Sequence, residues 1–248
     1  MRYGDFDQFK VKYLINLELT NESPLSIGMG KALWGAVDNP IIKKMDGLPY
    51  IPGSSVKGVL RAEAERYARS VYGINEVCDI LNPTGPQGEE RKQKDLGEKY
   101  EPCVICRIFG GPTIASHLTV YDAYPTSSYT IEVRRRVSIN RLTGGQHPGR
   151  LFEVEQVDPK VHWDLRLEIE NIDIIGGIEE NDNKRIKEIL NHLMRKILIE
   201  GVALGGKRSV GLGLVKGNLK GVKRFTIKDG KYFSEDVTET YRKILEAS

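Results

Sequence analysis

Asp38 is the first residue whose type and setting point to chemistry. It lies in the stretch GAVDNP, within a loop that has few other acids. Asp-Asn-Pro favours a turn, so turn formation alone can explain the residue. Beside a phosphate, however, a carboxylate is unfavourable unless it recruits a divalent cation or takes part in proton transfer. Asp38 is therefore a candidate catalytic residue.

A second candidate is the segment from Gly205 to Gly213, GGKRSVGLG, which holds four glycines and two cations in nine residues. Because glycine lacks a Cβ atom, backbone N–H groups here can approach phosphate oxygens while Lys207 and Arg208 neutralise charge. A tight turn between a helix and a strand explains the same glycines. In the first interpretation, five residues contact a phosphate backbone: Gly205, Gly206, Lys207, Arg208 and Ser209.

The same segment overlaps the G-x-x-x-x-G-K frame of a nucleotide-binding P-loop through Gly201, Gly206 and Lys207. That motif next requires Ser or Thr to hold magnesium, and this chain has Arg208 there. The motif also leaves a strand and enters a helix, the reverse of the order expected here. Nucleotide hydrolysis therefore explains the segment poorly.

Three cysteines form a candidate metal site. Cys103 and Cys106 have the Cys-x-x-Cys spacing that lets two thiolates bind one tetrahedral zinc ion, and Cys78 can supply a third ligand. The local sequence offers no fourth ligand, and we assign no role to His117, the nearest histidine. Structural zinc and three ordinary reduced thiols both fit the pattern. Redox activity is a third alternative.

A helix predicted between Gly53 and Gly73 positions a third group. Its apolar residues recur every three or four positions, and Ser54 or Ser55 is available as the N-cap. The unpaired N–H groups and the dipole at a helix start attract phosphate, and Lys57 and Arg61, one turn apart, can extend such a site. A capped surface helix with solvated charges is the alternative.

The remaining pattern predicts a mostly antiparallel sheet. Alternating residues indicate strands at 10–20, 117–122, 129–137 and 161–169, and a second helix begins at Asn181 or Asp182. Residues 134–156 form two strand-like arms around a polar tip, which indicates a projecting hairpin. Residues 78–111 show neither the helical nor the strand-like spacing of apolar residues, so we expect an irregular insertion loop. This order matches a ferredoxin-like α+β sandwich with insertions.

Composition limits the class of protein. Of 248 residues, 40% are hydrophobic and 29% charged, the balance of a soluble folded protein, and we expect a single domain over residues 1–248. No apolar run reaches the length of a membrane span and no secretion signal is evident, so we expect a cytoplasmic protein without membrane contact. Eight basic residues against one acid between Gly205 and Lys231 suggest a surface for a polyanion, or a solvated basic hairpin.

Four blocks of sequence together resemble the RAMP superfamily of CRISPR-associated proteins, specifically the backbone subunit of type III (Csm/Cmr-like) effector complexes. The blocks are GAVDNPIIK with LPYIPGSSVKGVLR, then CVICRIFG, then RRRVSINRLTG with LFEVEQV, and finally LGGKRSVGLGLV. The resemblance implies a modified RNA-recognition fold that polymerises along a guide RNA. It also implies that hairpin 134–156 is a thumb that displaces a base pair of the guide–target duplex.

The resemblance further assigns roles to residues. Asp38 would cleave target RNA with Mg²⁺ or Mn²⁺, and four hairpin arginines would contact phosphates: Arg134, Arg135, Arg136 and Arg141. The partners would be guide RNA, target RNA, further copies of the chain and other subunits of the complex. An inert scaffold that binds RNA without cleaving it is the main alternative. A guide-processing RAMP enzyme would need a base such as histidine, and neither the first helix nor the glycine-rich segment contains one.

Overall fold

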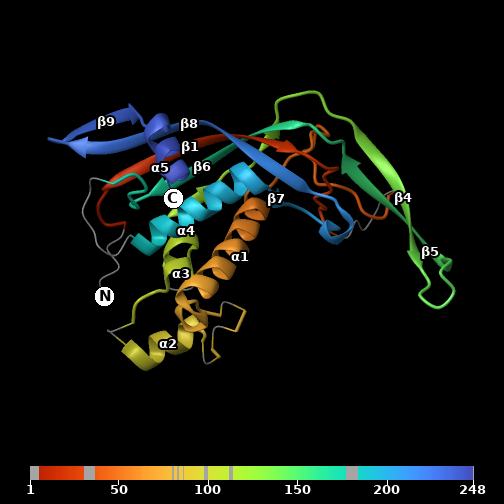
Figure 1. Ribbon diagram of the computed structural model, residues 1–248, viewed down its shortest axis with the longest axis horizontal. Helices are drawn as coiled ribbons and strands as arrows, with labels where there is room; N and C mark the ends of the chain where they lie inside the picture. The colour runs from red at the N-terminus through yellow and green to blue at the C-terminus, as the bar shows by residue number, and fades with distance from the viewer. Residues whose placement is uncertain are drawn as a thin grey trace.

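The computed structural model describes residues 6–30, 37–79, 81–82, 84–85, 87–97, 100–111, 114–176 and 184–247 (Figure 1). The helix cap predicted at Asn181 or Asp182 lies outside these residues. Within them the chain has a mixed α/β fold, in which helices pack beneath an antiparallel sheet and a long hairpin extends to one side. No helix in this part of the chain has the length and apolar character needed to cross a membrane.

The main sheet comprises seven of the described strands. Its path runs β2-β6-β1-β8-β7, with β3 paired to β6 and β9 paired to β8. The bounds are β1 Val11–Asn21, β2 Leu118–Val120, β3 Tyr124–Pro125, β6 His162–Glu170, β7 Val202–Ala203, β8 Leu214–Lys228 and β9 Lys231–Asp236. The strands predicted at 10–20, 117–122 and 161–169 are thereby confirmed.

The alternation of β1 produces one buried face of the sheet. Side chains of a strand point alternately to its two faces, and the odd-numbered residues of β1 are buried. In the register with β6, Leu17 lies opposite Leu165 and Leu19 opposite Trp163, so both strands direct apolar side chains to the same core. At the end of β1, the buried Asn21 accepts hydrogen bonds from Trp163 Nε1 and from the Val161 N–H group.

Three helices cover the buried face (Figure 1). They are α1 (Gly53–Tyr72), α3 (Val104–Phe109) and α4 (Lys184–Arg195), and α4 continues into a π-helical turn at Lys196–Glu200. The inner face predicted for the second helix is buried as expected: Ile186, Ile189, Leu190, Leu193 and Ile197. The sequence indicated a single strand after the glycine-rich segment, which corresponds to β8. The structure has two further elements after it, β9 and helix α5 (Thr238–Ala247).

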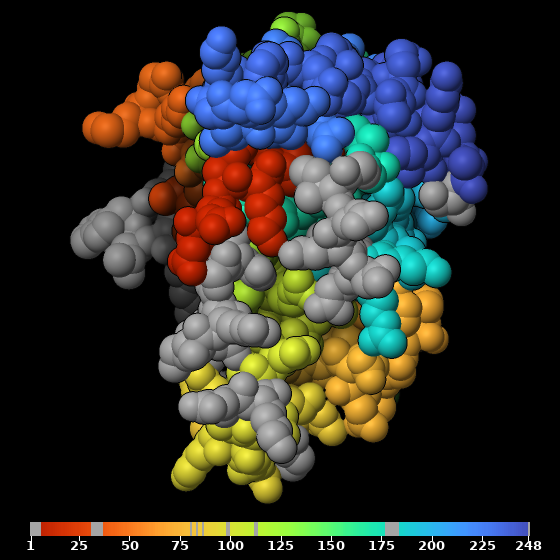
Figure 2. All heavy atoms as spheres, turned by 90° about the vertical axis from the view of Figure 1, so that its left-hand side faces the viewer, coloured from red at the N-terminus to blue at the C-terminus, as the bar shows by residue number. Residues whose placement is uncertain are grey.

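The prediction of an irregular loop at 78–111 is wrong for two parts of that segment. Helix α2 (Glu89–Leu96) and helix α3 both lie within it. Helix α2 is polar on nearly every side, and α3 spans only six residues, so neither shows the apolar period that a sequence search detects. In the view of Figure 2, the yellow residues around α2 lie at the end of the molecule opposite the blue strands β8 and β9.

The hairpin predicted at 134–156 is present as a separate two-stranded sheet. Strand β4 (Ile131–Ile139) pairs with β5 (Gln146–Val157), and the turn at 140–145 closes it. Figure 1 shows the tip of the hairpin well away from the helices. Its outer half is mostly exposed, and its inner end returns to the main fold, where it meets the loops described next.

Candidate nucleic-acid interface

The inner part of strand β5 is a platform on which the loop of Asp38 docks. The Asn39 N–H group donates to the Glu153 carbonyl oxygen at 3.1 Å, and the Glu155 N–H group donates to the Asn39 carbonyl oxygen at 3.0 Å. The Asn39 side chain adds a second bond to the Glu153 carbonyl oxygen at 3.1 Å. Asn39 therefore forms an isolated parallel β-bridge with Val154, and this bridge holds the loop alongside β5.

This docking fixes the carboxylate of Asp38. Its Oδ2 atom accepts a hydrogen bond from the Glu153 N–H group at 2.8 Å, and the residue is exposed. No further bond to the carboxylate is present within the described part of the chain. The cluster of three or more metal-binding side chains found there is the cysteine group, not one around Asp38. A cation at Asp38 would therefore take its other ligands from water or phosphate, as Mg²⁺ commonly does.

Glu155 makes the second attachment of this loop. Its carboxylate accepts from the Ile41 N–H group at 3.1 Å and forms an ion pair with Lys43 at 2.9 Å. Its carbonyl oxygen accepts from Ser26 Oγ at 2.8 Å. The sequence analysis did not identify Asn39 or Glu155, because their partners are more than 100 residues away along the chain and no local spacing records such contacts.

The glycine-rich segment reaches the same platform through Ser26. The Gly206 N–H group donates to the Ser26 carbonyl oxygen at 2.9 Å, and a Cβ atom on Gly205, whose φ is +78°, would collide with that oxygen. Lys207 lies with Nζ 5.4 Å from the centre of the Phe152 ring on β5. These glycines therefore do form a turn, but it connects the paired strands β7 and β8 and not a helix and a strand as predicted. The turn also presents Lys207 to the base of the hairpin.

The rest of this segment faces solvent. Arg208, Ser209 and Val210 form an exposed turn of 3-10 helix directly after Lys207. The side chains of Arg208 and Ser209 make no hydrogen bond or ion pair within the described residues, so they are available to a ligand. Asp38 thus lies on a loop bonded to β5, and Lys207 and Arg208 lie on a second loop that reaches β5 through Ser26 and Phe152.

The hairpin arginines differ in their contacts. Arg134 pairs with Glu132 and Arg135 with Glu153, each at 3.1 Å and on the surface. The Nε atom of Arg136 is buried and has no partner among the described residues, and Arg141 is exposed at the tip. Surface ion pairs contribute at most about 1 kcal/mol, so a phosphate can displace them. Ile139 and Leu142 are 59% and 96% exposed, an arrangement suited to contact with bases.

The predicted cap at the start of α1 is wrong. The N-cap residue is Pro52, without a side-chain cap, and Ser54 and Ser55 already lie within the helix. The Gly53 N–H group instead donates to Asp122 Oδ1 at 2.8 Å. Asp122, 69 residues away, thus satisfies an N–H group at the start of α1, where a local serine cap was expected.

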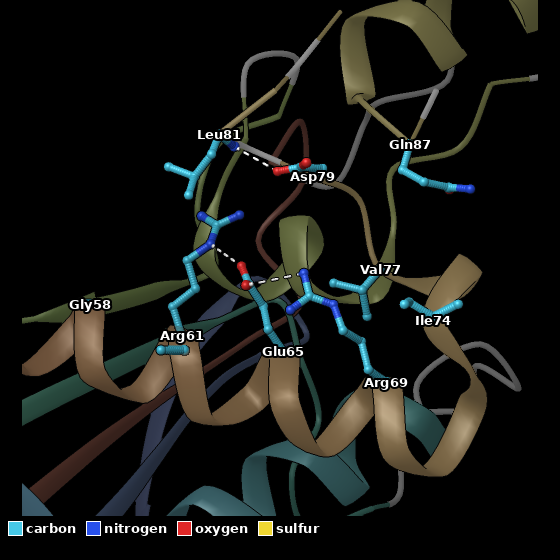
Figure 3. A pocket seen from close by; sticks show the side chains of 10 residues that line it. Gly58, Arg61, Glu65, Arg69, Ile74, Val77, Asp79, Leu81 and Gln87 are labelled. Atoms are coloured by element: carbon cyan, nitrogen blue, oxygen red, sulfur yellow. Dashed lines mark hydrogen bonds and ion pairs between the residues drawn. The ribbon is translucent and has the colours of Figure 1, made fainter. Parts of the chain in front are cut away.

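Lys57 and Arg61 do not contact this platform but lie on the side of α1 that faces α3. Lys57 Nζ donates to Ser116 Oγ at 2.7 Å, and burial followed by the nearby charge of Arg61 lowers the pKa of Lys57. Arg61 donates to the Gly110 carbonyl oxygen at 2.8 Å and pairs with Glu65. Figure 3 shows Arg61 and Arg69 both reaching Glu65 beside a cavity of about 640 Å³. Contact of these two side chains with RNA stays a prediction.

The three cysteines meet, as their spacing predicted. The sulfur atoms of Cys78 and Cys106 are 3.1 Å apart, and those of Cys103 and Cys78 are 3.5 Å apart. Side-chain hydrogen bonding with Cys106 and Cys78 lowers the pKa of Cys103 to about 2, while hydrogen bonding with Cys103 raises the pKa of Cys78 to about 12. These opposite shifts arise because thiols this close cannot all ionise without a cation.

The chain belongs to the RAMP superfamily. The family model of that description matches residues 18–216, a range that contains Asp38, the cysteines, the hairpin and the glycine-rich segment. The family expected from the sequence is thereby confirmed.

Several relatives share the name "CRISPR system Cms endoribonuclease Csm3". The one from Streptococcus thermophilus is 29% identical over 211 residues, which cover 83% of this chain and 86% of that protein. The one from Methanothermobacter thermautotrophicus is 28% identical over 241 residues, 84% of each chain. The one from Methanocaldococcus jannaschii is 28% identical over 193 residues, 73% of this chain and 68% of that protein.

A solved structure shares the fold. A chain in the cryo-EM structure of the Type III-B Cmr-beta bound to cognate target RNA aligns with a TM-score of 0.54 at 14% sequence identity. The alignment covers 83% of this chain and 96% of that one. At this identity the likeness shows the fold alone.

Proposed function

We propose that this chain is a guide-RNA-binding backbone subunit of a type III CRISPR interference complex and that it cleaves bound target RNA at Asp38. The names of its relatives support this assignment, since each describes a CRISPR endoribonuclease. One observation carries the cleavage step. The exposed Asp38 carboxylate is held 2.8 Å from the Glu153 N–H group, at the root of the projecting hairpin.

We also assign the core to the ferredoxin-like class, in the form of a modified RNA-recognition fold. Strands β1, β2, β6 and β8, with α1 after β1 and α4 after β6, repeat the β-α-β-β-α-β order. Their order in the sheet, β2-β6-β1-β8, supports the same assignment. In this description the chain is a single domain over 1–248, with an insertion at 78–111 and a thumb hairpin at 134–156.

RNA would lie across the platform formed by β5 and its two attached loops. Lys207 and Arg208 would bind guide phosphates, with Ser209 and the N–H groups of Gly205 and Gly206 beside them. Arg134, Arg135, Arg136 and Arg141 would contact the backbone along the hairpin, and Ile139 and Leu142 would separate neighbouring bases. The partners would be guide and target RNA, further copies of the chain along the guide, and other subunits, in the cytoplasm.

Cleavage would use the geometry imposed on the target strand. A nucleotide displaced by the hairpin can direct its own 2′-OH in line at the adjacent phosphate. The new bond from the 2′-oxygen to phosphorus would replace the P–O5′ bond, which would leave a 2′,3′-cyclic phosphate on one product and a 5′-hydroxyl on the other, while the 2′-OH proton passes to water. The Glu153 N–H group orients Asp38 through one carboxylate oxygen, so that the other oxygen can hold a cation. A bound Mg²⁺ or Mn²⁺ would stabilise the developing negative charge.

The test uses the complex assembled from the full-length chain, guide RNA and its other subunits. In Mg²⁺ the target should be cut beside each displaced nucleotide, and a single 2′-deoxy substitution at that nucleotide should prevent the cut there while neighbouring cuts remain. EDTA should stop all cleavage. Asp38→Ala should assemble normally and leave the target intact. Cleavage by Asp38→Ala at the wild-type rate would refute the catalytic assignment.

An inert RNA-binding scaffold is the second candidate. It is favoured by the solitary position of Asp38, which is not part of a carboxylate cluster within the described chain. The same assay separates the two functions, because an inert scaffold would protect or position the target without cutting it in any metal. Co-purification of short RNA with the chain is expected in both cases.

A further inference from the structure

A buried glutamate accompanies the three cysteines. Glu89, the first residue of α2, is 1% exposed, although a carboxylate is rarely buried without a strong partner. Its Oε2 atom is 3.3 Å from Cys106 Sγ, and its Oε1 atom accepts a hydrogen bond from the Tyr100 hydroxyl at 2.6 Å. The carboxylate is thus oriented toward the thiols by a second residue.

Three of the six separations among the four donor atoms are close to those of a metal site. A tetrahedral zinc ion, with Zn–S distances of about 2.3 Å and a Zn–O distance of about 2.0 Å, places its ligand atoms roughly 3.5–3.8 Å apart. The two sulfur separations involving Cys78 are 3.1 Å and 3.5 Å, and that from Cys106 to Glu89 is 3.3 Å. The three sulfur atoms lie within 4.8 Å of one another, whereas the Glu89 carboxylate is close to Cys106 and farther than 4.8 Å from at least one other sulfur. Rotation of the Glu89 side chain toward Cys78 and Cys103 would complete the tetrahedron.

The backbone closes the site around this set. A Cβ atom on Gly111 would lie 2.5 Å from Glu89 Oε2 and 3.1 Å from Cys106 Sγ, so only glycine leaves room for both ligands. On the other side, a cavity of about 300 Å³ borders Cys78, Cys103 and Tyr100 and gives a metal ion a route from solvent.

The positive charge of Arg61 lies beside the cysteines, where it can offset the negative charge of a metal site. Three thiolates and one carboxylate around Zn²⁺ carry a net charge of about −2. The Nη2 atom of Arg61 lies 3.7 Å from Cys106 Sγ, and its Nη1 atom is fixed by the Gly110 carbonyl oxygen. A guanidinium next to a metal-bound thiolate offsets part of this charge and links the site to α1.

We propose that Glu89 is the fourth ligand of a structural zinc site formed with Cys78, Cys103 and Cys106. The site ties three separate parts of the chain together: the segment after α1, helix α2 and helix α3. All four positions are filled by protein, so the ion is structural and has no open position for substrate. This inference rests on zinc binding at the cysteines and is independent of RNA cleavage at Asp38.

The test measures metal binding by the full-length chain in the absence of RNA. Purified wild-type protein should contain about one zinc ion per chain, and Co²⁺ in its place should give the visible bands of a tetrahedral site with a thiolate charge-transfer band. Glu89→Gln should weaken Co²⁺ binding by at least about tenfold. Glu90→Gln, the exposed neighbour on α2, is the matched control and should bind as wild type does.

A second variant guards against misfolding of the first. Glu89→Cys adds a thiolate at the proposed ligand position, so its charge-transfer band should grow by about one third, from three sulfurs to four, with the red shift of an all-sulfur site. The proposal is overturned if wild-type protein binds neither ion, if Glu89→Gln keeps wild-type affinity, or if the Glu89→Cys spectrum equals that of wild type. None of these results depends on whether the chain cleaves RNA.

Discussion

The Asp38 loop and the cysteine cluster are both assembled from distant parts of the chain, but by different means. The Asp38 loop is attached to β5 by backbone hydrogen bonds, and it leaves its carboxylate exposed. The cysteine cluster is built from side chains, two of them fully buried, with a buried glutamate beside them. Backbone attachment fixes a reactive group without enclosing it, whereas a shell of side chains encloses an ion and holds the surrounding segments together.

The largest effect should come from Asp38→Asn, which keeps the shape of the side chain and the bond from the Glu153 N–H group but removes the charge. Target cleavage should fall by about 10²–10³-fold, while guide binding and thermal stability stay near wild type. Single-turnover cleavage and a melting curve on the same preparation provide the measurement.

Asp46→Asn is the control for this experiment. Asp46 lies in the same segment and also accepts a backbone N–H, that of Leu48 at 3.0 Å, but it is not attached to β5. It should retain full activity. Equal losses in the two variants would mean that the segment matters for folding and not for chemistry.

Cys106→Ser should lower the stability of the chain and leave target cleavage intact, the reverse of Asp38→Asn. Loss of a buried metal ligand should destabilise the chain by about 3 kcal/mol, which for this length lowers Tm by roughly 6–12 °C. Cleavage at 25 °C by the assembled complex should persist, since among the described residues no hydrogen bond or ion pair joins the Asp38 loop to the cysteines. Chelator-treated wild-type protein should melt at the same lowered temperature. A variant that melts like untreated wild type would rule out a stabilising role for the site.

The same contrast explains what the sequence could predict. The alternation of β1, the periodic helix α1 and the hairpin arms are short-range patterns, so they were identified with bounds close to those observed. The Cys-x-x-Cys spacing indicated a shared site for Cys103 and Cys106 and offered Cys78 as a third ligand, and the structure brings all three together. The spacing alone fitted three ordinary thiols equally well.

Long-range contacts were not predictable in this way. The partner of the Gly53 N–H group is 69 residues away, and that of Ile41 is 114 residues away. Glu89 was missed because a glutamate in a polar stretch resembles many solvated ones, and only its burial against Cys106 distinguishes it. A sequence shows residue types and local periods, but it does not show which distant backbone group satisfies a donor.

Asn39→Ala would measure how far the platform, and not the carboxylate itself, sets the rate. The substitution removes the side-chain bond to the Glu153 carbonyl oxygen, a loss of about 1 kcal/mol, and leaves Asp38 in place. As a positioning residue, Asn39 should affect the cleavage rate about five- to tenfold with little change in target affinity. A loss of affinity without a change in rate would show that Asn39 binds RNA directly.

The smallest expected effect is a change in the salt dependence of guide-RNA binding. Comparing variants at the two ends of β8 shows which end of the strand lies at the RNA interface. Each phosphate contact that is lost should flatten the slope of log K against log salt by about 0.7 for single-stranded RNA, so Lys207→Ala and Arg208→Ala should each do so. Lys228→Ala removes an exposed cation at the other end of β8, within the basic stretch shared with β9, and should leave the slope unchanged. If all three variants flatten it equally, binding follows the overall positive charge from Gly205 to Lys231. If only the first two do, the guide is held beside Phe152 and the hairpin, close to the loop that carries Asp38.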